Sequence, residues 1–536
     1  VFYNWGTVRA TFNPQMYTNS KVIDIFGTMV AMVSSVDGSE QLEFVPHHLS
    51  ELPYSEDGGI TWICKFRDDV VWYEDDTPIN ADTYEYTFKM LLDPKLVNKN
   101  AAYVFDPCRV INARAYYAGE CEWEDVGIKN VGDNTLEITL EYPSTPVDFY
   151  STLGTVIWPV HPEIYEAGMN EDRTSTTYGT TVAETPSSGP FYLKEWVLDG
   201  YEVFALNEKD PLVKMGYFFA DEINGRYVSE TATIWQMFQN AELDWAPLSG
   251  DLYEANKNDP RANTSKSPMV WGILVNGASD NVIMQDNDFR LALYYSTPRV
   301  QVATEVYVLY KSPNYIISEG ISVQTADGGT MYYRDTPEAK AIVERFADND
   351  ELALELFDKA YEANGSQKIT VEMTYFDEQE DMKRTAEVCQ EKWENLFGSD
   401  RFELVLRAVQ PAQAYDNYRI GDYDLGTGTN LTNVFNMWSS FNIYTSDYAD
   451  KYVNGFANEE FDQLYFDSVY GELMDDPQGR IEALARMEEL LMEYVPFIPA
   501  MQNDNTWLTQ EWVELPTYTY LPFVGFGFRQ SDILPH

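Results

Sequence analysis

The sequence predicts a mixed α/β fold, because segments with strand periodicity and segments with helix periodicity interleave along the whole chain. One strand is expected where Leu136, Ile138 and Leu140 alternate with polar residues. Another is expected over 191–193, directly after a Gly-Pro pair. No low-complexity linker and no repeat of about 20 to 50 residues occurs, which excludes a solenoid.

Three helices are predicted from their end signals and apolar stripes. Asp476 caps the first, since a proline and an apolar stripe follow it. The second begins at Asn458. The third is expected over about 382–397, ended by Gly398 in a left-handed conformation. Cys389 lies on the apolar face of this third helix and is expected in the core.

The composition describes a large, acidic, folded chain. At about 150 residues per domain, 536 residues suggest three or four structural units. The 36 Lys and Arg against 87 Asp and Glu give a net charge of −51, which excludes nucleic acid and anionic lipid as partners. The 44% hydrophobic and 15% aromatic residues argue against disorder. No stretch approaches the roughly 18 uninterrupted apolar residues of a membrane helix.

The four cysteines argue against a sulfur-bound metal, because none is part of a C-x-x-C pair. Cys108 and Cys121 flank a short segment that can turn the chain back. The pattern leaves two alternatives open, a local disulfide or two free thiols. A disulfide across so short a loop would stabilise the fold by about 3 kcal/mol.

Common catalytic arrangements are missing from the chain. The four histidines, His47, His48, His161 and His536, form no H-E-x-x-H motif, and neither G-x-S-x-G nor a phosphate-binding loop occurs. We therefore expect no enzyme, no cofactor and no metal. A glycoside hydrolase is the hardest enzyme to exclude, because it needs only two carboxylates.

The longest patterned segment runs from Trp62 to Tyr86. Its aromatic and β-branched residues predict a strand, Asp75 begins a turn, and Asn80 caps a helix. As a string, it resembles the signature of the extracellular solute-binding proteins of the oligopeptide and dipeptide class, family 5, which feed ATP-binding-cassette importers. The family usually has glycine where Asp69 and Asp76 stand.

Further matches to this family follow in the expected order across nearly the whole chain. They are Phe12-Asn13-Pro14, the glycine-led strand from Ser187 to Trp196, Ala241-Glu242-Leu243-Asp244, the helix start at Asp288-Phe289-Arg290, and the element from Asn454 to Leu464. The resemblance therefore covers both halves of the sequence.

The resemblance implies a two-lobed, clam-like fold of the periplasmic-binding-protein type, of the large cluster, with an extra subdomain inserted in lobe one. Lobe one would comprise 1–41, 179–267 and 505–536, the inserted subdomain 42–178, and lobe two 268–504. Hinges are expected near 268–270 and 502–505. A solute would be enclosed when the hinges close.

The resemblance also implies which residues contact the solute. In the peptide binders, a loop after the early proline element and a strand-like segment of lobe two pair with the peptide backbone. Asn433 stands where the family has an aspartate for the peptide α-amine, and Thr427 stands where it has an arginine. Two alternatives follow: either the peptide termini are held elsewhere, for instance by Asp422, Asp424 or Arg419, or the ligand is uncharged. The predicted ligand contacts are Met16, Tyr17, Thr18, Asn19, Trp271, Tyr423, Gly428, Thr429, Asn430, Asn433, Phe435, Trp438, Gln502 and Asn503.

The function predicted from this resemblance is that of a solute receptor that encloses an oligopeptide and delivers it to a membrane permease. One alternative is the same fold binding an oligosaccharide or another uncharged solute by stacking on aromatic rings. Further alternatives are a secreted glycoside hydrolase and a cell-wall adhesin. The receptor is expected to be a monomer, either periplasmic or extracellular at the cell surface. In the latter case a lipid anchor is expected in the full-length precursor.

Overall fold

The described part of the chain forms two compact units. The computed structural model describes residues 2–4, 11–15, 25–34, 42–105, 108–198, 200–228, 230–307, 311–377, 379–431, 438–448, 453–515 and 530–535. Unit 1 comprises 1–248, 255–265 and 506–536, and unit 2 comprises 249–254 and 266–505. The finer division, with a separate subdomain over 42–178, stays a prediction.

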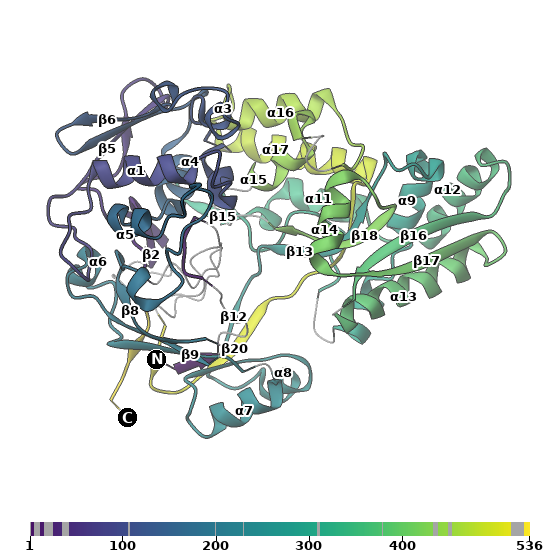
Figure 1. Ribbon diagram of the computed structural model, residues 1–536. Helices are drawn as coiled ribbons and strands as arrows, with labels where there is room; N and C mark the ends of the chain where they lie inside the picture. Colours follow the sequence, from purple (N-terminus) through teal and green to yellow (C-terminus); the bar gives the residue numbers. More distant parts are fainter. Residues whose placement is uncertain are drawn as a thin grey trace. The chain divides into compact units, whose positions relative to one another are not determined.

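Unit 1 is built mainly from short strands (Figure 1). Its strands are β1 (Phe2–Asn4), β2 (Val30–Ser34), β3 (Leu42–Pro46), β4 (Tyr54–Ser55), β5 (Thr61–Lys65), β6 (Ile128–Gly132), β7 (Thr135–Thr139), β8 (Phe191–Val197), β9 (Tyr201–Leu206), β10 (Glu222–Arg226), β11 (Trp245–Pro247), β12 (Ala262–Ser265), β21 (Val513–Glu514) and β22 (Asp532–Ile533). Strand β20 (Asn505–Thr509) belongs to unit 1 from Thr506 on. Its helices are α1 (Ala81–Leu91), α2 (Ala102–Phe105), α3 (Ala113–Tyr117), α4 (Pro146–Phe149), α5 (Pro162–Ala167), α6 (Pro211–Lys214) and α7 (Thr231–Gln239), while α8 (Gly250–Asn256) crosses the unit boundary.

Two four-stranded sheets of unit 1 share one core. Their strand orders are β1-β10-β9-β8 and β4-β5-β7-β6, beside a three-stranded sheet β11-β20-β12. The predicted strands at 136–140 and 191–193 are confirmed as β7 and β8, apart from Leu140, which lies one residue beyond β7. Leu136 of β7 and Phe191 of β8 belong to the same cluster of buried apolar side chains. Burial of these alternate side chains therefore fixes which face of each sheet points inward.

Unit 2 combines one mixed sheet with long helices (Figure 1). Its strands are β13 (Met269–Val275), β14 (Ser322–Gln324), β15 (Thr330–Tyr332), β16 (Ile369–Phe376), β17 (Phe402–Val409), β18 (Leu425–Leu431) and β19 (Phe497–Met501). Its helices are α9 (Asn287–Tyr295), α10 (Arg299–Gln301), α11 (Pro337–Arg345), α12 (Asp350–Ala363), α13 (Glu380–Phe397), α14 (Pro411–Ile420), α15 (Trp438–Phe441), α16 (Glu459–Val469) and α17 (Pro477–Tyr494). The strand order of the main sheet is β17-β16-β18-β13-β19.

The predicted helix ends in unit 2 are confirmed. The Asp476 side chain accepts a hydrogen bond from the Gly479 amide and so caps α17, and Asn458 caps α16 in the same way. Gly398 follows α13 with φ of +89°, the sign that favours glycine, although its ψ of 125° lies outside the left-handed helical region. Cys389 of α13 is fully buried, as predicted.

The patterned segment from Trp62 to Tyr86 folds as predicted into a strand, a turn and a helix. Asn80 caps α1, since its side chain accepts from the Thr83 amide at 3.0 Å. Asp76 in the turn has φ of +60°. Because only glycine adopts this backbone conformation without steric cost, the structure explains why the family usually has glycine there.

The disulfide alternative for Cys108 and Cys121 is wrong for this structure, in which both are free thiols. Cys108 is buried and its Sγ lies 3.0 Å from Thr152 Oγ1, whereas Cys121 is partly exposed and its Sγ faces the Asn112 carbonyl. Burial raises the pKa of the Cys108 thiol to about 12. The thiolate needed for disulfide chemistry is therefore disfavoured.

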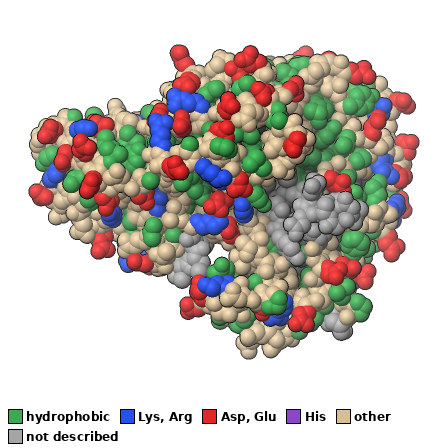
Figure 2. All heavy atoms as spheres, turned by 180° about the vertical axis from the view of Figure 1, so that it is seen from behind, with side chains coloured by type: hydrophobic (Ala, Val, Ile, Leu, Met, Phe, Trp, Pro, Cys, Tyr) green, Lys and Arg blue, Asp and Glu red, His purple; other side chains and the backbone are tan. Residues whose placement is uncertain are grey.

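Few of the charged side chains that the structure describes are buried, Glu488 and Arg334 among them. Figure 2 shows Asp and Glu side chains over the whole of the face drawn, with Lys and Arg between them. Exposed ion pairs such as Arg419 with Asp416 contribute little to stability, about 0–1 kcal/mol each.

Candidate functional site

Strand β18 carries the predicted lobe-two contacts and has one edge open. Along β13 it is paired over its whole length, with Trp271 opposite Thr429 and Gly272 opposite Gly428. On its other side, β16 pairs only with Leu425 and Gly426. From Thr427 to Leu431, this second edge has no partner strand among the residues that the structure describes. Unpaired backbone groups at such an edge can accept an added strand.

Two buried polar side-chain atoms at positions considered for the site lack a hydrogen-bond partner. Thr427 is 1% exposed and Gln502 is 0% exposed. Within the described ranges, Thr427 Oγ1 and Gln502 Nε2 have no hydrogen-bond partner. A buried polar group without a partner costs about 1–3 kcal/mol, so both positions favour a ligand that supplies one.

Gln502 is held by a charged cluster of unit 2. Its backbone exchanges hydrogen bonds with Lys311 at 2.7 and 3.0 Å. The Lys311 ammonium pairs with Glu319 and lies 2.8 Å from Asp504. Burial opposes its charge, but the hydrogen bonds to Asp504 and Glu319 raise the pKa of Lys311 above its ordinary value. The residues around Gln502 are therefore fixed by charge-assisted hydrogen bonds.

A buried ion pair supports the segment that leads to this cluster. Glu488 of α17 is fully buried and accepts from the Ile316 and Ile317 amides, each at 2.9 Å. It also pairs with Arg334, whose Nε donates to the Ile317 carbonyl at 2.6 Å. The two amide bonds hold residues 316 and 317 against α17, and Arg334 links the Ile317 carbonyl to Glu488. Glu488 thus anchors the chain between Lys311 and β14.

Two of the five aromatic residues predicted to contact ligand, Tyr423 and Trp438, are buried in the structure. Tyr423 is 5% exposed, and its hydroxyl donates to the Val453 carbonyl at 2.8 Å. Trp438 is 4% exposed, with the Arg480 guanidinium 4.9 Å from its ring centre. Trp271 is only half-buried. Of these three side chains, Trp271 retains the most surface for a ligand.

Several predicted contacts fall outside what the structure describes. Met16, Tyr17, Thr18, Asn19, Asn433 and Phe435 lie outside the described residues, and for Asn430 only the backbone is described. Asn503 is described and half-buried. The structure thus brings Trp271, Gly428 and Thr429 together on neighbouring strands, with Met501, the residue before Gln502, opposite Trp271 on β19.

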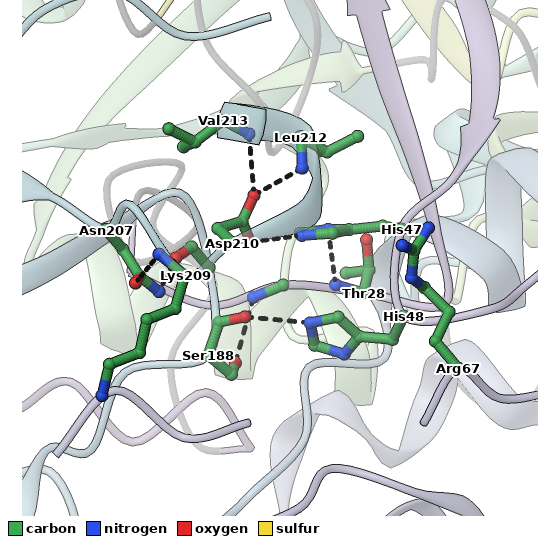
Figure 3. A network of polar contacts seen from close by, with 12 residues as sticks. Thr28, His47, His48, Arg67, Ser188, Asn207, Lys209, Asp210, Leu212 and Val213 are labelled. Carbon is green, nitrogen blue, oxygen red and sulfur yellow. Dashed lines mark hydrogen bonds and ion pairs between the residues drawn. The ribbon is translucent and has the colours of Figure 1, made fainter. Parts of the chain in front are cut away.

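A second buried polar network lies in unit 1 (Figure 3). His47 Nε2 lies 2.7 Å from Asp210 Oδ2, and the same carboxylate caps α6 through the Leu212 and Val213 amides. The His48 ring, 4.5 Å from that of His47, donates from Nε2 to the Ser188 carbonyl at 2.9 Å. Burial, followed by the neighbouring His47, lowers the pKa of His48 well below 6.5.

The two imidazoles pack against Gly27 and Thr28, which follow the predicted loop at 16–19 in the chain. A Cβ atom placed on Gly27 would lie 2.0 Å from His48 Nε2 and 2.7 Å from His47 Cε1. Only glycine fits so close to both rings. The Thr28 amide next to it donates to His47 Nδ1. The histidine pair therefore fixes where the chain enters β2 after leaving that loop.

Neither of these two networks was predicted from the sequence, although one signal for them is present. Glu488 stands between Leu484 and Leu491 on the apolar stripe of α17. An acidic residue in such a stripe indicates a buried partner. No comparable signal marks His47 and His48, because their partner Asp210 is far away in sequence.

Comparison with known proteins defines the class of this molecule in two steps. Its fold is that of the two-lobed periplasmic-binding proteins. It superposes on an oligopeptide transporter substrate-binding domain from Bacillus anthracis with a TM-score of 0.77 and 19% identity, covering 100% of this chain and 98% of that one. The peptide-bound OppA of Listeria monocytogenes gives a TM-score of 0.75 and 18% identity, covering 100% and 99% of the two chains.

The sequence then identifies the family. The model of the bacterial extracellular solute-binding proteins, family 5, matches residues 43–452, and the chain belongs to this family. The dipeptide-binding protein DppE of Bacillus subtilis is 23% identical over 456 residues, 85% of this chain and 78% of that protein. The oligopeptide-binding protein OppA of the same organism is 25% identical over 476 residues, 86% and 80% of the two proteins.

Both of these relatives are named as binding proteins, and two further relatives, both from Escherichia coli, are named as periplasmic binding proteins. Within the described residues, no helix has both the length and the apolar character needed to cross a bilayer. In the same residues, no group of three or more His, Cys, Asp or Glu side chains is arranged to hold a metal ion.

Proposed function

We propose that this protein is the extracellular or periplasmic receptor of an ATP-binding-cassette importer, and that it binds an oligopeptide and delivers it to the membrane permease. The observation that carries the proposal is membership of family 5 over 43–452, together with relatives named for dipeptide and oligopeptide binding. Hinge closure around the peptide, near 268–270 and 502–505, belongs to the same proposal.

The open edge of β18 supports binding through the peptide backbone. Its unpaired stretch, from Thr427 to Leu431, overlaps the predicted contacts at Gly428, Thr429 and Asn430. An extended peptide added at this edge would satisfy its backbone groups by strand addition, which does not depend on the peptide sequence. Thr427 Oγ1 and Gln502 Nε2 would then bond to peptide carbonyl groups or side chains.

The absence of charge at Thr427 and Asn433 makes the peptide termini less important than in the resembled binders. A hydroxyl and an amide can hydrogen-bond to a terminus but lack the strength of a charge-assisted bond. We therefore expect peptides with blocked termini to bind nearly as well as peptides with free termini. This expectation separates the protein from a receptor that selects by the α-amine.

A solute other than a peptide is the second candidate. One relative, 22% identical over 512 residues, is named as a probable deoxycholate-binding periplasmic protein of Escherichia coli, so the relatives of this chain are not all named for peptides. An oligosaccharide has less support, because stacking on sugar needs free aromatic faces and Tyr423 and Trp438 are buried.

Native mass spectrometry with a mixed library of peptides, glycans and bile acids tests the proposal. We expect intact peptides to be retained, with free and blocked termini alike. Retention of glycans or bile acids without peptides would contradict the peptide assignment.

Strand addition has its own test on a retained peptide. Methylation of single backbone nitrogens should abolish binding at alternate positions, because only every second amide of an added strand faces β18. A uniform tolerance of N-methylation would contradict strand addition.

A further inference from the structure

The outward face of one unit 1 sheet carries a pocket that none of the predicted ligand contacts lines. The pocket has a volume of about 980 Å³. Its lining side chains come from β1, β8, β9, β10 and β22 and from the turns beside them. Ligand pockets in proteins usually span about 300–1,000 Å³, so the hollow is large enough for a small molecule.

The strand register explains the hollow. Tyr192 of β8, Ala205 of β9 and Glu222 of β10 stand opposite one another across the sheet. Phe191 and Phe204, their chain neighbours, point the other way into the core of unit 1. Ala205 has the smallest side chain of the outward row and so leaves space between larger neighbours.

Aromatic rings form the walls of this pocket. The rings of Tyr73 and Tyr192 stack with centroids 3.8 Å apart and an interplanar angle of 9°. Phe2 and Phe219, which also line the pocket, are 41% and 48% exposed. Exposed phenylalanine side chains beside a hollow indicate a surface that another molecule covers.

The wall already holds one ammonium group of the protein itself. Lys209 Nζ lies 5.0 Å from the centre of the Tyr73 ring and donates to the Tyr73 carbonyl at 2.8 Å. Because Tyr192 covers one face of the Tyr73 ring at 3.8 Å, the ammonium lies over the opposite face. In the same stacked pair, Tyr73 covers only one face of the Tyr192 ring. Ring faces of this kind attract cations.

The charges of the lining favour a cation as well. Both lysines are neutralised, Lys194 by Glu222 and Lys209 by Asp76 at 2.6 Å. The remaining lining carboxylates, Glu208, Asp221 and Asp532, have no ion-pair partner among the residues described. An anion would meet unpaired negative charge here, whereas a cation would meet carboxylates and aromatic faces together.

We infer that this pocket is a second binding site, for a small organic cation whose ammonium or guanidinium group sits on the Tyr192 ring. The site goes beyond the proposed peptide function and does not depend on it. Its apolar rim at Phe2 and Phe219 would cover the carbon body of the same molecule.

Choline and its uncharged isostere dimethylbutanol, in which tert-butyl replaces trimethylammonium, are the probes. Titration of the intact protein by calorimetry at physiological salt should give a Kd for choline of about 1 mM or tighter, and at least tenfold weaker binding of the isostere. Equal binding of the two probes, or a choline Kd above about 10 mM, would overturn the inference.

Three variants locate the site. Tyr192→Ala should weaken choline binding at least tenfold, while Tyr192→Phe retains it because the ring is kept. Tyr201→Ala, another half-buried tyrosine of the same sheet that does not line the pocket, is the matched control and should leave the Kd unchanged. General attraction to an acidic protein would leave Tyr192→Ala without effect and so contradict the inference. Competition between choline and a retained peptide would also contradict it, because choline would then occupy the peptide site.

Discussion

Unit 1 buries two imidazole rings beside a carboxylate, whereas unit 2 buries a guanidinium beside a carboxylate. In unit 1, His47 and His48 make hydrogen bonds that suit neutral rings, to Thr28, Ser188 and the Asp210 carboxylate. In unit 2, Glu488 and Arg334 form an ion pair that burial would make costly to separate. Each network fixes a segment near the predicted ligand contacts, but only that of unit 1 contains histidine, the residue type whose ordinary pKa lies near neutral pH.

The difference predicts separate responses of the two units to mutation and to pH. Removing one member of an ion pair leaves a buried charge at every pH. A buried neutral imidazole, by contrast, lowers the stability of the protein only at acid pH, where the unfolded chain is protonated. Four experiments follow, from the largest expected effect to the smallest.

Glu488→Gln should destabilise unit 2 by about 3–5 kcal/mol, because Arg334 is left buried without its counter-charge. The midpoint of denaturant-induced unfolding measures this change. Glu489→Gln, on the same helix, removes only partly exposed ion pairs with Arg345 and Arg486 and should cost less than about 1 kcal/mol. Equal losses of stability in the two variants would show that the buried ion pair contributes no more than the exposed ones.

The stability of unit 1 should decrease as the pH falls below about 6.5, through His48. Its pKa is lowered in the folded protein, so the unfolded chain takes up the proton first. The contribution of the neutral ring is therefore complete above 6.5, and acid removes it by about 1.4 kcal/mol per pH unit.

The His48→Gln variant isolates this term from the many carboxylates of the chain. The difference in unfolding free energy between wild type and variant should be constant above pH 7 and should shrink as the pH falls. A difference that stays constant down to about pH 5 would rule out a proton-linked role for His48.

Helix caps offer a matched pair across the two units. Asn80→Ala in unit 1 and Asn349→Ala in unit 2 each remove one side-chain bond to a backbone amide at 3.0 Å, and each should cost about 1 kcal/mol. If the units unfold separately, Asn80→Ala should shift the same transition as His48→Gln, and Asn349→Ala the transition that Glu488→Gln shifts. The reverse assignment would contradict the division into these two units.

Tyr423→Phe should cost about 0.5–1.5 kcal/mol of stability, because the hydroxyl loses its bond to Val453, and should leave ligand affinity unchanged. Gln502→Ala is the complementary variant, since its Nε2 has no partner in the described structure, and it should weaken binding more than folding. A loss of ligand affinity in Tyr423→Phe would show that the Tyr423 hydroxyl takes part in ligand binding.

Local signals in the sequence predicted the elements well. The caps at Asn80, Asn458 and Asp476 depend on side chains that bond to an amide only three residues away. The longer pattern around them was specific enough to predict the family. Structure and sequence agree wherever the deciding contact is close along the chain.

Long-range contacts could not be predicted. Nothing local shows that Glu488 pairs with Arg334, 154 residues away, or that His47 pairs with Asp210, 163 residues away. Cys108 and Cys121 are close in sequence, yet burial of Cys108 against Thr152 keeps the thiols apart. Tyr423 and Trp438 carry the rings that stacking requires, but the same rings fill a core, and only burial distinguishes the two uses.

The central claim is that the protein is a receptor for peptides and not an enzyme. The most direct test is to incubate the protein with one peptide that it retains, and to measure both binding and whether the peptide stays intact. At 100 times its Kd, the peptide should stabilise the protein by about 2.7 kcal/mol against unfolding and should be recovered intact after long incubation. Cleavage of the peptide, or binding without stabilisation, would contradict the account.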